Sequence, residues 1–294
     1  MKFIVLLSCS LALENVIVAK NYETDNKDNE TDLTKLDRRL KIVNGWPTTI
    51  EKYPFTVSLQ DRRRHGRYGH MCGASIIGRH WIMTAAHCLT KEYSNQLMDN
   101  VMQLRIVVGA TTVEPEPDAA AVYHSIESVH VSPCWMVRPK KVVECDIGLI
   151  KTTKAIDFTT RVQPVKLWKY TPVYRLGDVA VLGWGKTARD QRLPPQPNTL
   201  RGVYLQPIKC HNYRTLCLKA GYGYDAAHGD SGGPVVAHVK MVQGEPEYVQ
   251  VGIASGGFRK LEGRWHNRNT DVAEFCDWIR DTTKSDFCFR KPNQ

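Results

Sequence analysis

The stretch Gly229-Asp230-Ser231-Gly232-Gly233-Pro234 decides how the rest of this sequence is interpreted. In it a serine stands among glycines and next to an aspartate. Glycine has no side chain, so a glycine-rich backbone can approach a reactive group closely. A stretch of this kind is also typical of a surface turn, and its partners elsewhere in the chain have to decide between the two interpretations.

Two distant motifs supply such partners, Thr84-Ala85-Ala86-His87-Cys88 and Asp146-Ile147-Gly148-Leu149-Ile150. The chain order His, Asp, Ser is one of the known orders of a catalytic triad. A serine hydroxyl is a poor nucleophile until a base takes its proton and a third group orients that base. The pattern therefore predicts that His87 activates Ser231 and that Asp146 orients His87.

Together with Ile42-Val43-Asn44-Gly45, these motifs resemble the chymotrypsin/trypsin family of secreted serine endopeptidases over residues 42–294. The resemblance implies an all-β fold of two antiparallel six-stranded β-barrels, with the active site between them and a C-terminal helix. It also implies peptide-bond hydrolysis through an acyl-enzyme on Ser231, without a cofactor. The backbone N–H groups of Gly229 and Ser231 would form the oxyanion hole.

Short β-prone runs separated by turn residues agree with a barrel architecture. Among them are Phe55–Leu59, Ala74–Ile77, Trp81–Thr84, Leu104–Val108, Val179–Leu182, Gly202–Leu205, Val235–Val239 and Tyr248–Ile253. One helix is predicted from Asp271, an N-cap with Glu274 three residues later. Its apolar residues fall at i, i+3, i+4 and i+7, on one face: Val272, Phe275, Cys276 and Ile279.

The first 41 residues read as segments that are removed from the mature protein. Residues 1–19 have a basic start, an apolar run and a small residue, as in a secretory signal peptide cut after Ala19, or alternatively after Ala12. Residues 20–41 are polar and resemble an activation propeptide. The resemblance implies a cut after Lys41 that frees the Ile42 ammonium to pair with Asp230, and residues 42–294 would then be the protease domain of a zymogen.

Nine cysteines include Cys9 in the signal segment, which leaves eight for pairing in an oxidising compartment. The family resemblance pairs Cys72 with Cys88 and Cys210 with Cys217. Outside the common family set, Cys134 and Cys145 look like a bridge that closes an inserted loop ending beside Asp146. By elimination Cys276 pairs with Cys288, although a helix continuing between them would hold them about 18 Å apart.

The formal net charge of +10 lies entirely after Lys41, because residues 1–41 hold seven basic and seven acidic side chains. Two basic loops, Arg62–Arg67 and Arg138–Lys141, could recruit an acidic substrate or a protein inhibitor, although charged loops are more often simply solvated. No nucleic-acid module, membrane span or metal motif stands in the sequence. We expect a secreted, extracellular monomer that meets a protein or peptide substrate and an activating protease.

The substrate pocket is where the sequence departs from the family. The resemblance assigns substrate binding to Asp225, Ser255, Gly257 and Asn267. A carboxylate such as Asp225 at the floor of an apolar slot favours cleavage after Arg or Lys. However, Ala227 replaces a cysteine of the pocket wall, Gly256 stands where tryptophan is usual, and Asn267 stands where glycine is usual unless a shifted loop brings Gly263 there.

Two other classes of function compete with the endopeptidase. One is a protease-like binding protein with little or no turnover, which the altered pocket would favour. The other is a basic adaptor that acts through the Arg62–Arg67 loop. The intact His87, Asp146 and Ser231 set favours the enzyme over both.

Overall fold

A computed structural model describes residues 45–62, 67–91, 94–114, 117–138, 142–170, 172–185, 199–210, 214–219, 230–240, 247–261 and 264–289. Several predictions fall outside these residues. They are the signal peptide, the propeptide with its Lys41–Ile42 junction, Asp225, Ala227, Gly229, Gly263 and most of the two basic loops.

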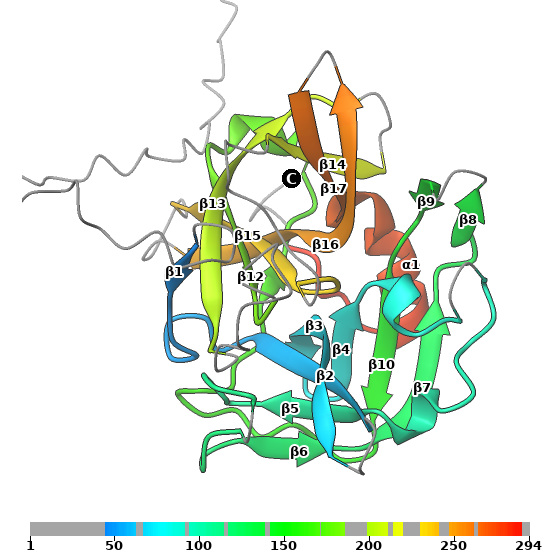
Figure 1. Cartoon of the computed structure of the whole chain (residues 1–294), viewed down its shortest axis with the longest axis vertical. Coiled ribbons are helices and arrows are strands. Elements are labelled where there is room, and N and C mark those ends of the chain that lie inside the picture. Colours follow the sequence, from blue (N-terminus) through cyan, green and yellow to red (C-terminus); the bar gives the residue numbers. More distant parts are fainter. Residues whose placement is uncertain are drawn as a thin grey trace, which may run out of the picture.

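The first half of the chain forms a curled antiparallel sheet in the order β6-β5-β2-β3-β4-β10-β7. Its strands are β2 (Thr56–Arg62), β3 (Tyr68–Gly78), β4 (Trp81–Thr84), β5 (Arg105–Val108), β6 (Val122–His124), β7 (Ile126–Val131) and β10 (Gly148–Thr152). The side chains that fill it are mainly aliphatic, among them Val57, Leu59, Ile76, Ile82 and Leu149. A short hairpin of β8 (Met136–Arg138) and β9 (Val142–Glu144) extends from the ends of β7 and β10 (Figure 1).

The second half closes into a six-membered ring, because β13 pairs with β14 as well as with β12. Its strands are β12 (Val179–Gly183), β13 (Arg201–Ile208), β14 (Thr215–Lys219), β15 (Pro234–Val239), β16 (Glu247–Leu261) and β17 (Arg264–Asp271). Two short strands add to it, β1 (Trp46–Pro47) on β13 and β11 (Lys166–Leu167) on β16. Figure 1 shows the two sheets as separate halves of the molecule. The predicted all-β, two-barrel fold is confirmed, and each β-prone run matches a strand of the two sheets, although Phe55 and Leu104 lie one residue before β2 and β5.

The predicted helix is present, but its first turn is tighter than an α-helix. The Asp271 carboxylate accepts a hydrogen bond from Ala273 N at 3.2 Å and caps the 3-10 turn η7 (Val272–Phe275), which leads into α1 (Cys276–Thr283). The predicted apolar face is buried in the same core cluster as the first sheet. Other short 3-10 turns are η3 (Ala86–Cys88), η4 (Val101–Gln103) and η6 (Val173–Arg175). Within the described part of the chain, neither α1 nor these turns are long and apolar enough to cross a membrane.

Four disulfides connect these elements, Cys72–Cys88, Cys134–Cys145, Cys210–Cys217 and Cys276–Cys288. The last pair was uncertain from the sequence, because a continuous helix would separate its cysteines. The helix in fact ends after Thr283, where Lys284 takes a left-handed conformation with φ of 58°. The chain therefore folds back and brings the Cα atoms of Cys276 and Cys288 to 6.0 Å.

Candidate active site

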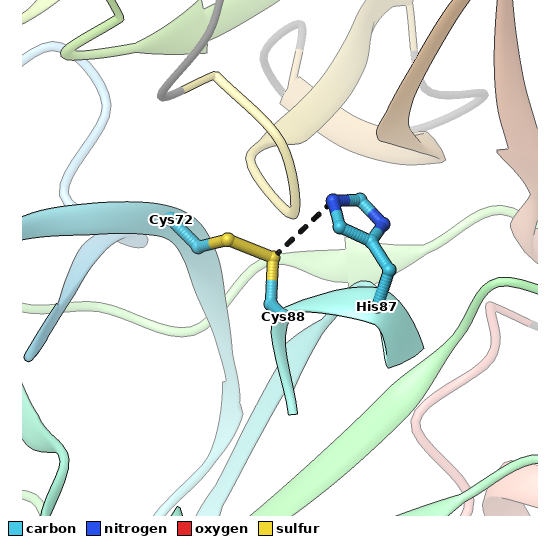
Figure 2. A group of neighbouring side chains, drawn as sticks. All are labelled: Cys72, His87 and Cys88. Atoms are coloured by element: carbon cyan, nitrogen blue, oxygen red, sulfur yellow. Dashed lines mark hydrogen bonds between the residues drawn. A yellow bond between two sulfur atoms is a disulfide. The ribbon is translucent and has the colours of Figure 1, made fainter. Parts of the chain in front are cut away.

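The ends of strands place the three residues that the sequence singled out. His87 lies in η3 directly after β4, Asp146 lies between β9 and β10, and Ser231 lies in the turn before β15. The disulfide from Cys88 to Cys72 ties η3 to β3, beside the imidazole (Figure 2). These positions are far apart in the chain but are joined by rigid strands and a covalent bridge.

Both carboxylate oxygens of Asp146 contact His87. Oδ1 accepts from the backbone N–H of His87 at 2.9 Å, and Oδ2 lies 2.7 Å from the ring Nδ1. The carboxylate is only 2% exposed, whereas the imidazole is 31% exposed and so has a face open to solvent. A buried carboxylate held in this way fixes both the position and the orientation of the ring.

The pKa values of the pair move apart. Burial alone would lower the pKa of His87, but the charge and hydrogen bond of Asp146 outweigh it and raise the pKa. Burial would likewise raise the pKa of Asp146, but the charge of His87 and hydrogen bonds from His87 and Ser255 hold it below its usual range. The pair therefore consists of a carboxylate that stays ionised and a base that accepts a proton readily.

Two further side chains hold Asp146, and the sequence did not assign either of them to this role. Ser255, which the resemblance assigned to substrate binding, donates its hydroxyl to Oδ2 of Asp146. Thr270 donates its hydroxyl to the backbone oxygen of Asp146 at 2.7 Å. Neither residue carries a local signal, because each meets Asp146 only when β16 and β17 lie against the start of β10.

The Ser231 turn is locked by main-chain contacts. The carbonyl of Ser231 accepts from Gly73 N at 2.7 Å, and Gly232 N donates to the carbonyl of Ala254 at 2.6 Å. Gly232 has φ of 80°, and a Cβ there would lie 2.2 Å from Oγ1 of Thr84. Only glycine fits such a position. The turn is thereby fixed against β3 and β4, the strand that leads to His87.

Among the described residues no hydrogen bond joins Ser231 to His87. Nε2 of His87 lies instead 3.7 Å from Sγ of Cys88, as the dashed line in Figure 2 shows. Hydrogen bonds of a catalytic base to its nucleophile are often long in the free protein and tighten when substrate binds. The structure thus brings His87 and Asp146 into direct contact and fixes Ser231 on a neighbouring turn.

Asp230 lies against the end of β12 in the second barrel. It is 1% exposed, and its Oδ1 accepts from Gly185 N at 2.9 Å. Added Cβ atoms at Gly183 and Gly185 would lie 2.4 Å and 2.5 Å from this carboxylate. These two glycines make room for the buried aspartate, a requirement that the sequence alone did not indicate.

Asn267 is buried on β17, between Leu218 of β14 and Phe258 of β16. Its side chain is 2% exposed, and in the part of the chain that is described its Nδ2 has no hydrogen-bond partner. A buried amide without a partner is costly and calls for an explanation. The predicted pocket residues Asp225 and Gly257 do not supply that explanation. Asp225 lies outside the described residues, and only the backbone of Gly257 is described.

Possible metal ligands among the described residues have other roles. Cys72, His87 and Cys88 lie together (Figure 2), but both sulfurs are bonded to each other, so neither is the thiolate that a metal needs. Asp118 accepts from Thr111 N and pairs with Arg161 at 2.8 Å. Its carboxylate therefore braces the loop after β5.

Comparisons with known proteins agree with this geometry. The Trypsin family model matches residues 42–279. Venom serine protease 34 from Apis mellifera is 33% identical over 261 residues, which cover 84% of this chain and 60% of that protein. Chymotrypsin-2 from Vespa crabro is 33% identical over 246 residues, which cover 81% of this chain and 98% of that protein. Trypsin epsilon from Drosophila erecta is 29% identical over 270 residues, which cover 86% of this chain and 90% of that protein. The chain belongs to the trypsin family of serine endopeptidases, hydrolases that act on proteins.

Proposed function

We propose that this protein is a secreted zymogen that is activated by cleavage after Lys41 and then cleaves proteins after Arg or Lys. The observation that carries the catalytic part is the contact between His87 and the buried Asp146, beside a turn that fixes Ser231. The four disulfides support export, because such bonds persist in oxidising compartments.

In the proposed reaction, Nε2 of His87 removes the proton from Oγ of Ser231 as that oxygen attacks the substrate carbonyl. The carbonyl oxygen becomes an oxyanion and accepts hydrogen bonds from the backbone N–H groups of Gly229 and Ser231, each typically worth about 100- to 1,000-fold in rate. His87 then passes its proton to the leaving amine, and water hydrolyses the acyl-enzyme by the reverse proton path. Asp146 stabilises the imidazolium in both halves of the reaction.

Asp230 supports the proposed activation mechanism. Its carboxylate is buried and directly precedes Ser231, so the charge that pairs with it controls the backbone of the oxyanion hole. We propose that the ammonium of Ile42, freed by cleavage after Lys41, is that charge. Loss of one partner of a buried ion pair costs about 3 to 5 kcal/mol, enough to leave the uncut chain with little activity.

Lys41→Gln is expected to prevent activation and to lower activity by roughly 100-fold or more, because the Ile42 ammonium is never formed. The measurement is limited trypsin digestion followed by N-terminal sequencing and a peptide-hydrolysis assay. Lys35→Gln, six residues upstream, is the matched control and should activate normally. Full activity of the Lys41→Gln chain, or activity in wild-type protein without a free Ile42, would show that the protein is not this kind of zymogen.

The proposed preference for Arg and Lys depends on Asp225 at the floor of the pocket. Asp225→Ser is expected to lower kcat/KM for P1-Arg and P1-Lys peptides by about 100-fold or more, because a buried cationic side chain would lose its partner. P1-aromatic peptides should be affected much less. Measurement of kcat/KM on the three substrates decides the matter, and an unchanged basic preference would exclude Asp225 as the pocket floor.

Asn267 should act against basic substrates. Its Nδ2 is a buried donor that lacks an acceptor among the described residues, and a guanidinium or ammonium brings only further donors. Asn267→Gly is therefore expected to raise kcat/KM for P1-Arg peptides by about 10-fold. Asn95→Gly, at an exposed position of the first half of the chain, is the control and should leave P1-Arg turnover unchanged. Equal or lower P1-Arg turnover after Asn267→Gly would place this side chain outside the substrate pocket.

A further inference from the structure

The hairpin of β8 and β9, which Figure 1 shows, is closed at its base by the Cys134–Cys145 disulfide, and Cys145 immediately precedes Asp146. A second tie lies beside the bridge, where Ser132 N donates to the carbonyl of Ile147 at 3.1 Å. Ile147 N in turn donates to the carbonyl of Cys145 at 2.8 Å, which places Asp146 at the centre of a three-residue turn. The backbone of the aspartate is thus set by the base of this hairpin.

Cys145 has an unusual backbone conformation. Its φ is 53°, and among the described residues other than glycine only Lys284 shares a positive φ. A residue with a side chain keeps this conformation only where its surroundings enforce it. The disulfide to Cys134 is the covalent restraint on Cys145, so breaking it removes what holds the residue next to Asp146.

The contacts of Asp146 show what such a change would disturb. Its carboxylate accepts from the backbone N–H of His87 and lies against Nδ1 of the ring. Its backbone oxygen accepts from the hydroxyl of Thr270. The bond from Thr270 holds the carbonyl end of Asp146, and the turn that begins at Cys145 holds its amino end. Loss of the Cys145 turn leaves Asp146 held, among the described residues, by Thr270, Ser255 and His87, so we expect its carboxylate to shift relative to the imidazole.

The two sulfurs of this bridge are not equivalent. Cys134 is partly exposed, whereas Cys145 is 4% exposed. Nη1 of Arg214 lies 3.5 Å from Sγ of Cys145. A guanidinium stabilises a thiolate, and a stabilised thiolate is the better leaving group in thiol–disulfide exchange. Attack at Cys134 with departure of Cys145 is therefore the favoured direction.

Only one other bridge in the described structure has a partly exposed cysteine. Cys72–Cys88 and Cys276–Cys288 are buried at both ends, but Cys210 of the Cys210–Cys217 bridge is partly exposed. That bridge lies after β13 and on β14, and neither of its cysteines takes part in the hydrogen bonds that hold Asp146. It is the natural control.

We propose that the Cys134–Cys145 disulfide is a redox-modification site that positions Asp146, so that its reduction by a dithiol lowers protease activity and its re-formation restores it. The inference rests on the proposed catalytic role of Asp146. One thiolate of the dithiol attacks Sγ of Cys134, the S–S bond breaks, and Cys145 leaves as the thiolate. The second thiol then attacks the mixed disulfide and releases Cys134. The dithiol ends as a disulfide, and the two cysteines have gained two electrons and two protons.

The test is a titration of the activated protein, with a proven Ile42 terminus, with dithiothreitol. Free thiols are trapped by alkylation and located by mass spectrometry, and kcat/KM is measured on the same samples. Alkylation of Cys134 and Cys145 should coincide with a loss of kcat/KM of about 10-fold or more, and reoxidation with oxidised glutathione should reverse it. The double variant Cys134→Ala/Cys145→Ala should show the lowered kcat/KM and no response to dithiothreitol. Cys210→Ala/Cys217→Ala should keep the wild-type kcat/KM.

A second readout separates positioning from general loss of structure. Asp146 raises the pKa of His87, so the acidic limb of the pH profile of kcat/KM should move to lower pH in the reduced protein. Partial unfolding would instead lower the number of titratable active sites and leave the limb in place. If the double variant fails to fold, reduction and reoxidation of the wild-type protein decide the question.

The outcomes are distinct from those that test the catalytic proposal. Unchanged kcat/KM with Cys134 and Cys145 fully alkylated overturns the inference, as does an equal loss in the Cys210/Cys217 control. If the oxidised protein shows no turnover, the proposed function fails. The low-field proton resonance of Nδ1–H of His87, assigned by its loss in His87→Ala, still tests the inference, since it should shift or vanish on reduction.

Discussion

Ser231→Ala is expected to lower kcat by about a million-fold, because the acyl-enzyme can no longer form. The fold should be unaffected, since Ser231 meets Gly73 through its backbone oxygen and the turn depends on Gly232. The activated protein is assayed for peptide hydrolysis and for labelling by a fluorophosphonate probe, which bonds to an activated serine. Both signals should disappear in the variant.

The control for Ser231→Ala is Ser128→Ala, which removes a hydroxyl that bonds to His130 on β7. It should keep both turnover and labelling. Turnover retained in Ser231→Ala would assign the nucleophile to another residue. Wild-type protein with a proven Ile42 terminus that fails to label would favour the alternative of a protease-like binding protein.

Asp146→Asn is expected to lower kcat by about 10,000-fold near neutral pH. The carboxylate accepts from Nδ1 of His87, whereas an amide can present N–H to that nitrogen and favour the tautomer with its proton on Nε2. A protonated Nε2 cannot accept the proton of Ser231. The remaining activity comes from substrate binding and the oxyanion hole.

The pH profile of kcat/KM is a second measurement that tests the Asp146→Asn prediction. The charge and hydrogen bond of Asp146 raise the pKa of His87 against the effect of burial. Their loss lets burial dominate, so the acidic limb of kcat/KM should move to lower pH in Asp146→Asn. Asp157→Asn, which changes an exposed partner of Arg79, should leave kcat and the limb unchanged. A limb that stays in place would mean that another group sets the pKa of His87.

Local sequence signals were sufficient for the main elements of the fold. Short β-prone runs separated by turn residues predicted the strands, and Asp271 with its apolar face predicted the C-terminal helix. These signals work because they depend on neighbours within a few residues, such as the bond from Ala273 N to the Asp271 side chain. These signals did not distinguish the 3-10 turn η7 from the first turn of an α-helix, because both have the same cap and a similar apolar face.

The end of α1 was decided by a conformation that the sequence does not specify. Lys284 is not glycine, yet it takes φ of 58° and ends the helix. The Cys276–Cys288 bridge is the tertiary tie that accompanies this turn. A propensity argument favours continuation at such a residue, so the sequence could reach the pairing only by elimination.

The sequence by itself determined the chain order of the three motifs and predicted His87, Asp146 and Ser231 as a triad, because the motifs occur together in the order of a known triad. Only the tertiary structure decided what holds them. Ser255 and Thr270 reach Asp146 across 109 and 124 positions of the chain, and Gly183 and Gly185 are glycines because Asp230 lies against them. The contacts of Asp146 arise from the packing of one barrel on the other, those of Asp230 from packing within the second barrel, and no local pattern of polarity or spacing encodes either.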